Sequence, residues 1–235
     1  MSSLLRSTDR LNNFSDGVFG VAITVLIVPV FNQITEPPAK KDLLALIHDD
    51  LLRGLAVWFL SVGVVGTFWI AHHNILHLVK RWDRWLLWIN TAFLMSVTFL
   101  PVPMAILANY WLPGQGDVAF RDGTIGLTAY GVAVIVSSGW LYAIWTYMTR
   151  HRELLWEDVN TELFEPVKRQ IRKGPAVYLT AIVLAWLIYW SPLRWLSIWP
   201  ALLLFGVVQV WYMMPGNIDR DAERRSARPP VPVGE

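Results

Sequence analysis

One stretch of the sequence decides the fold class, and it reads FSDGVFGVAITVLIVPVF over residues 14–31. No charged side chain follows Asp16 before Glu36. A membrane-spanning helix needs about 20 mainly apolar residues. A secretory signal would be followed by a small-residue cleavage site, whereas this stretch is followed by Asn32-Gln33-Ile34-Thr35-Glu36-Pro37-Pro38. We therefore predict a retained transmembrane helix over residues 14–35.

The rest of the chain repeats this pattern of long apolar runs separated by polar or helix-breaking residues. The 235-residue chain is 54% hydrophobic and 16% charged, whereas soluble domains carry about 25% charged residues. The runs predict an all-α membrane protein with six transmembrane helices, at residues 14–35, 52–79, 85–112, 123–149, 175–190 and 193–214. These helices make one unit over residues 1–215.

The basic residues predict how the helices are oriented. Six helices place both termini on one side, and that side receives 15 of the 20 lysine and arginine residues. Basic residues are concentrated in cytoplasmic loops. We therefore expect both termini to be cytoplasmic in a multi-pass protein of the cell membrane.

Two segments outside the predicted helices have compositions of their own. Residues 150–173 place apolar side chains between acidic and basic ones, which is typical of an amphipathic cytoplasmic or membrane-surface segment. Residues 216–235 are charged and rich in proline. Such a composition predicts a disordered cytoplasmic tail.

Composition and missing motifs exclude several functions. The chain has 20 basic and 18 acidic residues, a balance that argues against binding nucleic acid. It has no cysteine, which excludes disulfides, thiolate metal sites and cysteine nucleophiles. It has neither a Gly-x-Ser-x-Gly elbow nor a glycine-rich phosphate loop. We expect no enzyme activity and no cofactor.

Polar side chains gather near the predicted cytoplasmic ends of the first three helices. Such groups are costly at membrane depth and usually face the protein interior. They are Arg10, Ser15 and Asp16 in the first helix, Trp69, His72, His73 and His77 in the second, and Asn90 and Thr91 in the third. They could satisfy one another in one layer, with Asp16 accepting hydrogen bonds and Asn90 bridging. The alternative is that they are interfacial residues facing headgroups and water.

Two of the histidines have a spacing that also suits metal coordination. His73 and His77 are four residues apart and share one helix face. A closed site needs a third or fourth ligand, and Asp16 is the only nearby acidic candidate. No His-Glu-x-x-His motif accompanies them. We predict no metal site.

Helical periodicity leaves the role of the first helix open. At about 100° per residue, one stripe of the helix contains Gly17, Val21, Thr24, Val25 and Val28. The opposite side contains Ile23, Ile27 and Val30, together with Asp16. Both sides are apolar beyond the first turn, as expected for a central helix with protein on all sides.

Three motifs, in this order and spacing, resemble the transmembrane-protein-175 family of potassium channels. The first is Arg10-x-x-x-Phe14-Ser15-Asp16, which continues through Gly17 to Val30. The second is Trp69-Ile70-Ala71-His72, and the third runs from Asn90 to Pro101. The resemblance by motif covers about the first half of the chain; the second half is similar only in hydropathy and helix number.

The resemblance implies a homotetramer in which the first helices of four subunits line a central pore. Selectivity would come from a hydrophobic constriction, in contrast to the carbonyl filter of ordinary potassium channels. By motif position, the constriction falls on Val21, its hydroxyl neighbour on Thr24, and deeper apolar layers on Val25 and Val28. Relatives have isoleucine or leucine at the constriction, so the smaller valine implies a wider, less selective neck.

The resemblance also assigns the polar residues to an inter-helical hydrogen-bond network that holds the pore helix. Its members would be Arg10, Ser15, Asp16, Trp69, His72 and Asn90. We therefore expect a potassium-permeable, weakly selective channel whose partners are other copies of the chain, the lipid bilayer and potassium ions. A proton-linked secondary transporter with an Asp16–His72 relay is the alternative, followed by a membrane-embedded histidine-metal enzyme.

Overall fold

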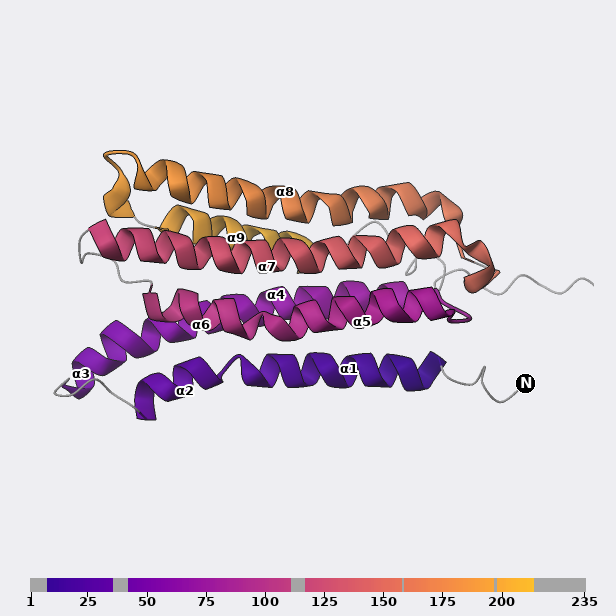
Figure 1. Cartoon of the computed structure of the whole chain (residues 1–235), viewed down its shortest axis with the longest axis horizontal. Coiled ribbons are helices and arrows are strands. Elements are labelled where there is room, and N and C mark those ends of the chain that lie inside the picture. Colours follow the sequence, from indigo (N-terminus) through magenta and orange to yellow (C-terminus); the bar gives the residue numbers. More distant parts are fainter. Residues whose placement is uncertain (1–7, 36–41, 111–116, 158, 197, 214–235) are drawn as a thin grey trace, which may run out of the picture.

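The long helices run along one common axis in stacked layers (Figure 1). The computed structural model describes residues 8–35, 42–110, 117–157, 159–196 and 198–213. From the bottom of the view to the top, the layers are α1 (Thr8–Val25) with α2 (Val28–Thr35), then α4 (Leu52–Leu76) with α5 (Arg84–Phe99) and α6 (Pro101–Tyr110), then α7 (Asp117–Arg150), α8 (Phe164–Tyr189) and α9 (Trp199–Met213).

Short helical pieces fill the connections between the long helices. They are α3 (Leu43–Ala45), η1 (Leu46–Leu51), η2 (Arg152–Leu154), η3 (Thr161–Leu163) and η4 (Arg194–Leu196). Within the described ranges, extended pairing is limited to one isolated bridge between Val79 and Leu155. The protein is therefore all-α, as its sequence predicts.

Among the described residues, five helical segments are long and apolar enough to cross a bilayer. They are Arg10–Asn32, Gly54–Leu76, Arg84–Tyr110, Val118–Arg150 and Phe164–Tyr189. Because hydrocarbon cannot hydrogen-bond to exposed backbone, helices of this length and composition indicate a multi-pass membrane protein. The predicted sixth helix corresponds to α9, which is 15 residues long, so the sixth crossing stays a prediction.

The first predicted helix differs from the structure at both its start and its middle. The helix begins at Thr8 instead of residue 14, and it is interrupted after Val25 before resuming at Val28. The ring of Pro29 carries no backbone N–H and crowds the carbonyl four residues earlier. At the interruption the Ile27 N–H donates to the Thr24 carbonyl at 3.4 Å, one residue short of the α-helical spacing. The prediction of one continuous helix over 14–35 is therefore wrong.

The predicted helix boundaries in the second half also need correction. Helix α7 begins at Asp117 instead of residue 123, and α8 begins at Phe164 instead of residue 175. The sequence predicts that a helix begins at Pro175, yet α8 begins earlier and continues through this proline. Membrane helices tolerate proline when neighbouring structure satisfies or buries the freed groups, and Gly174 and Tyr178 are buried here. Residues 150–173 are thus divided among α7, η2, η3 and the start of α8. The amphipathic and cytoplasmic character expected of this stretch stays a prediction.

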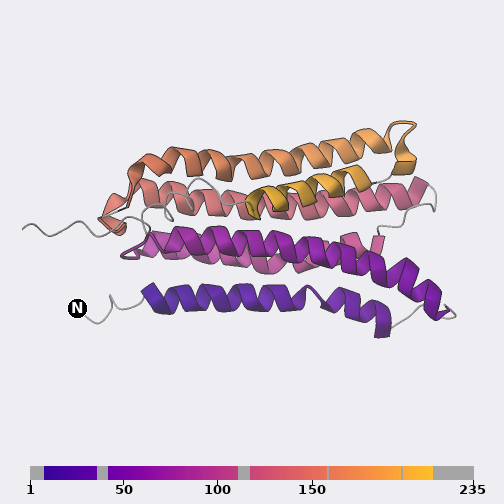
Figure 2. The ribbon, with the colours of Figure 1, turned by 180° about the vertical axis from the view of Figure 1, so that it is seen from behind.

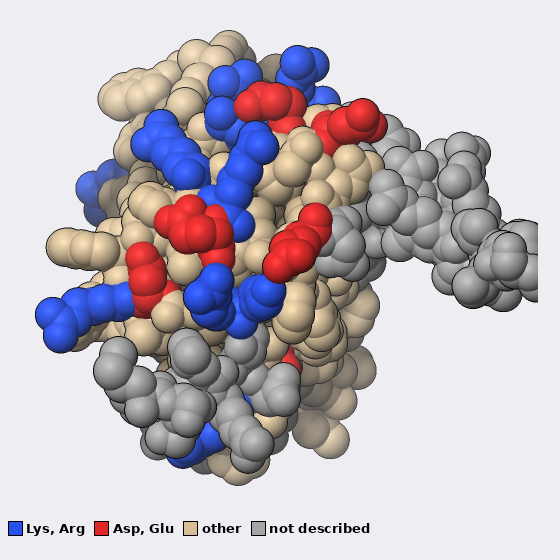
Figure 3. Space-filling model, turned by 90° about the vertical axis from the view of Figure 1, so that its right-hand side faces the viewer, with Lys and Arg blue, Asp and Glu red and all other residues tan. Residues whose placement is uncertain are grey.

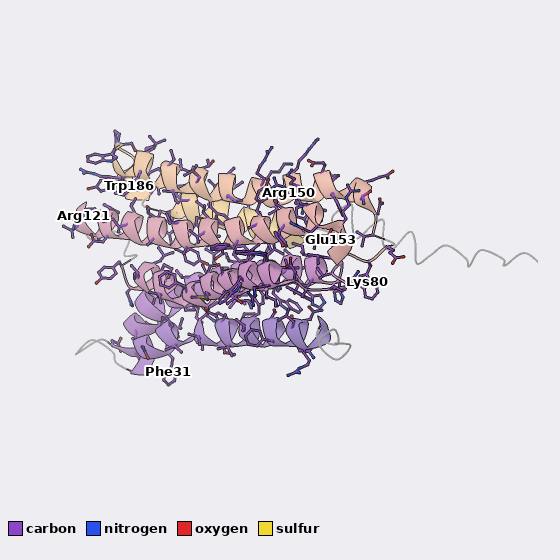
Figure 4. All side chains as sticks on the ribbon, turned by 45° about the vertical axis from the view of Figure 1, so that its right-hand side comes forward. Phe31, Lys80, Arg121, Arg150, Glu153 and Trp186 are labelled. Atoms are coloured by element: carbon purple, nitrogen blue, oxygen red, sulfur yellow. The ribbon has the colours of Figure 1, made fainter. Side chains whose placement is uncertain are left out.

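Charged side chains gather at the end of the bundle where α1, α5 and α8 begin and α4 and α7 end (Figures 1 and 3). Lys80, Arg150 and Glu153 lie at this end, and Arg121 and Trp186 lie at the opposite one (Figure 4). This grouping is the one expected from the basic residues in the sequence. The predicted disordered tail over 216–235 lies outside the described residues.

Candidate functional site

Helix α1 lies at the edge of the bundle and packs on one face. Figures 1 and 2 both place α1 and α2 on the outer side of the layer formed by α4, α5 and α6. Helix α1 packs mainly against α4 and α5. Its inward face consists of Phe19, Ala22 and Leu26, which are all buried. Together with buried Ser15, these residues have the i, i+4, i+7, i+11 spacing of one helix face.

The stripe predicted as pore lining is the exposed face of this helix. The side chain of Val21 is 59% exposed, and Val25 and Val28 are 42% and 47% exposed. Thr24 is also exposed, and its hydroxyl donates to the Val21 carbonyl at 2.8 Å. The opposite side is packed at two of its three apolar positions: Val30 is buried and Ile23 half-buried, but Ile27 is 38% exposed. The interruption after Val25 explains this difference, because it changes the helical phase.

Two hydrogen bonds join α1 to α5 and α4 through a buried amide. The Asn90 side-chain N–H donates to the Ser15 hydroxyl at 3.4 Å. The Asn90 carbonyl oxygen lies 2.7 Å from His72 Nε2, which donates in the matching tautomer. Ser15, Asn90 and His72 are all buried. The chain of contacts therefore connects three helices inside the bundle.

Aromatic rings hold the imidazole of His72 on two sides. The His72 ring centroid lies 5.5 Å from that of Phe19 and 5.0 Å from that of Phe93, which stacks on it. Sequence reasoning did not identify Phe19 and Phe93 as part of this site. The signal for Phe19 was available, because it lies four residues after Ser15 and hence on the same helix face. In the same way, Phe93 lies three residues after Asn90 and hence on the same face of α5.

A second contact joins α1 to α4 nearer the surface. The Trp69 indole N–H donates to Asp16 Oδ1 at 2.8 Å. The same carboxylate oxygen lies 3.8 Å from His73 Nδ1, and the His73 ring lies against Trp69 with centroids 5.6 Å apart. Asp16 is therefore fixed to α4 by an indole, and its second neighbour is His73 instead of the predicted His72.

The predicted polar network is thus two groups, and Arg10 belongs to neither. One group is Ser15, Asn90 and His72, and the other is Asp16 and Trp69. Arg10 is exposed, and in the described part of the chain its side chain has no hydrogen bond or ion pair to the other five. Thr91 is also exposed and donates to the Leu87 carbonyl of its own helix at 2.9 Å.

Among the described residues, the site lacks the contacts that the two alternative functions need. In the described part of the chain, no hydrogen bond connects Asp16 to His72, so a direct proton relay between them lacks its first link. Among the same residues, no group of three or more histidine, aspartate or glutamate side chains has a metal-binding arrangement. A catalytic metal needs three protein ligands in most zinc enzymes.

Comparison with known proteins agrees with the motifs in the first three spans. Residues 10–101 match the family model described as "Endosomal/lysosomal potassium channel TMEM175". A protein named potassium channel Cha6605_3372, from Chamaesiphon minutus, is 29% identical over 78% of this chain and 86% of its own length. The chain is thus similar to the TMEM175 family over its first three predicted spans. Helices α1, α4 and α5, which carry the site, are the part covered by the family model.

The fold of this chain is also seen in a solved structure. The crystal structure of a TMEM175 homologue from Chamaesiphon minutus, described as a lysosomal potassium-selective channel homologue, superposes with a TM-score of 0.65 over 88% of this chain and 96% of that one, at 24% identity. Among other relatives, potassium channel B446_29190 of Streptomyces collinus is 27% identical over 77% of this chain. The human endosomal/lysosomal proton channel TMEM175 is 24% identical, and the chain covers 39% of its length.

Proposed function

We propose that this protein is a potassium-permeable, weakly selective cation channel of the cell membrane. Four copies assemble around a central path, with both termini in the cytoplasm and α1 of each copy lining the path. The observation that carries the proposal is the exposed apolar stripe of α1 at Val21 and Val25, which continues at Val28 in α2. The helix that bears it is tied to α4 and α5 by hydrogen bonds on its other face.

The size of the side chains on this stripe supports a protein-lined path over a lipid contact. Between Phe14 and Phe31, the exposed positions of α1 and α2 are glycine, valine, threonine and isoleucine. By contrast, the exposed face of α5 carries Trp85, Trp88, Met95 and Phe99 beside two threonines. Large apolar and aromatic residues suit lipid and its interfaces. Small residues instead let neighbouring helices approach closely around an axis.

The proposed barrier arises at a ring of Val21 side chains. A cation that enters the ring must shed water where methyl groups offer no replacement oxygen, and an apolar neck can also exclude water by dewetting. The Thr24 hydroxyl, one turn further along, donates to the Val21 carbonyl. Its oxygen lone pairs remain available to a cation leaving the neck. Valine is smaller than the isoleucine or leucine of the family motif, which fits a wide neck and weak selectivity.

The buried polar groups act as anchors in this proposal. Ion passage through an apolar neck requires that four side chains keep their distance from the axis. Asn90 and Trp69 hold α1 in register and rotation against α5 and α4. Because the hydrogen bonds on the packed face of α1 are satisfied, they also keep the exposed face of this helix in a fixed position.

The test of the proposed function is ion flux through purified protein in liposomes. We expect K⁺ to leave loaded vesicles passively, and Na⁺ to leave more slowly. The rate of K⁺ efflux should not saturate in the way that the rate of a carrier does. Because animal relatives are named proton channels, proton entry is followed in the same vesicles with a pH-sensitive dye. Flux that requires a proton gradient, or proton flux without K⁺ flux, would favour the transporter or a proton path and contradict the proposal.

Assembly offers a separate prediction. One subunit supplies one copy of α1, so a closed path needs several, and we expect tetramers in mild detergent by native mass spectrometry. A protein that remains monomeric or dimeric while conducting K⁺ would exclude the proposed pore. The resemblance to the family, which rests on sequence and fold, would be unaffected by that result.

A further inference from the structure

His73 in the last turn of α4 and His77, the residue that caps this helix, have their outer ring nitrogens at hydrogen-bond distance. His73 Nε2 and His77 Nε2 lie 2.9 Å apart. The ring centroids are 4.4 Å apart and the ring planes meet at 84°. His77 is exposed and His73 half-buried, so solvent reaches the pair. Neither residue belongs to the hydrogen-bonded groups that tie α1 to its neighbours through Ser15 and Trp69.

The separation of the two nitrogens fits coordination of one metal ion. A late first-row metal binds imidazole nitrogen at about 2.0–2.1 Å. Two such nitrogens at a right angle, as in the tetragonal geometry of Cu²⁺ or Ni²⁺, lie about 2.9 Å from each other. We propose that His73 and His77 form a binding site for late first-row divalent cations, with Cu²⁺ and Ni²⁺ preferred. Both Nε2 atoms coordinate the ion, and water completes its shell.

The surroundings of His73 favour the tautomer that such a site requires. For Nε2 to coordinate a metal, the ring proton must lie on Nδ1. His73 Nδ1 lies 3.8 Å from Asp16 Oδ1, which is longer than a hydrogen bond, so the carboxylate acts on the ring through its charge. A nearby carboxylate favours a proton on Nδ1 and raises the basicity of the ligating nitrogen. The Trp69 N–H keeps this carboxylate in position at 2.8 Å.

The site differs from a closed structural or catalytic metal centre. In the described ranges, no third histidine, aspartate or glutamate completes the arrangement. Binding is therefore reversible, and it is selective for metals that prefer nitrogen. Hard cations such as Mg²⁺ prefer oxygen ligands. Because Asp16 belongs to α1, a bound ion would rest on contacts that join α4 to the helix proposed to line the path.

The test is a Cu²⁺ titration of the full-length protein purified without a histidine tag. We expect one tight Cu²⁺ per chain by calorimetry, with two nitrogen ligands in the electron paramagnetic resonance spectrum, and no heat from Mg²⁺. His73→Ala or His77→Ala should weaken Cu²⁺ binding by about 100-fold, since even an outer-shell partner can cost a metal site that much. Both side chains are at least partly exposed, so the variants should fold and assemble normally.

A matched double variant keeps the number of histidines constant. In His77→Ala with Asn74→His, the second imidazole moves to the exposed position next to His73. Adjacent residues of a helix do not face each other, so this variant should lose the tight site. His151→Ala, which removes a histidine from another segment, should bind Cu²⁺ as the unaltered protein does. The proposal is overturned if the unaltered protein binds no Cu²⁺ tightly, or if the double variant binds it equally well.

Discussion

Val21→Ser is expected to raise K⁺ flux through the reconstituted protein by about tenfold and to reduce its preference for K⁺ over Na⁺. Valine offers only methyl groups, whereas the serine hydroxyl offers an oxygen. This oxygen can replace part of the water that a cation loses in the neck. A fall of about 1.4 kcal/mol in the barrier is enough for a tenfold change in rate. The side chain is 59% exposed, so the packing of the subunit should change little. The measurement is K⁺ and Na⁺ efflux from liposomes at equal protein density.

Three control variants separate the neck from other effects of the substitution. Val132→Ser makes the same change at a valine of α7 that is 49% exposed, and it should leave flux unchanged. Val21→Ile should reduce flux and sharpen the preference for K⁺, because it restores the bulk found in relatives. Ile23→Ala removes a half-buried side chain on the packed side and should mainly lower stability. If Ile23 governs ion preference and Val21 does not, α1 is rotated relative to the path and the assignment of Val21 is wrong.

Asn90→Ala is expected to lower the free energy of unfolding of the subunit by about 1–3 kcal/mol for each buried partner that it leaves unsatisfied. Asn90 is the only residue that contacts both Ser15 and His72 through the hydrogen bonds described here. Both partners are buried, so water cannot replace the lost amide. The cost should appear as a lower melting temperature in detergent and a smaller yield of assembled protein.

Thr91→Ala is the matched control for this variant. Thr91 is the next residue of α5, is exposed, and bonds only to a carbonyl of its own helix among the described contacts. Its loss should change the melting temperature little. Asp16→Asn should also cost less than Asn90→Ala, because the Asp16 side chain is 38% exposed and its amide oxygen can still accept from Trp69. An Asn90→Ala variant that is as stable as the unaltered protein, but conducts differently, would place Asn90 in the ion path.

The sequence predicted the broad class and the similarity to a family, and it placed the second and third spans to within a few residues, whereas the bounds of the first, fourth and fifth helices differ more. The motifs at Phe14-Ser15-Asp16, Trp69 to His72 and Asn90 to Pro101 lie within the stretch matched by the family model. Proline was the main source of error. Pro29 interrupts a helix that was expected to be continuous, whereas Pro175 lies inside a helix that was expected to begin there. A proline removes the same backbone donor in both places, and the neighbouring packing decides whether the helix continues.

By itself, the sequence determined that the chain is helical and crosses a membrane. Hydropathy over about 20 residues is a local property, and a bilayer leaves the backbone no partner except its own helix. The tertiary structure decided which face of α1 is buried, because both faces are apolar and only the position of α4 and α5 distinguishes them. It also decided the polar partners: Asn90 reaches Ser15 across 75 residues and Trp69 reaches Asp16 across 53. Arg10 lies outside both polar groups for the same reason, and His73, which was not predicted as a member of the network, lies 3.8 Å from the Asp16 carboxylate. Hydrogen bonds of this kind depend on where separate helices meet, which periodicity within one helix does not specify.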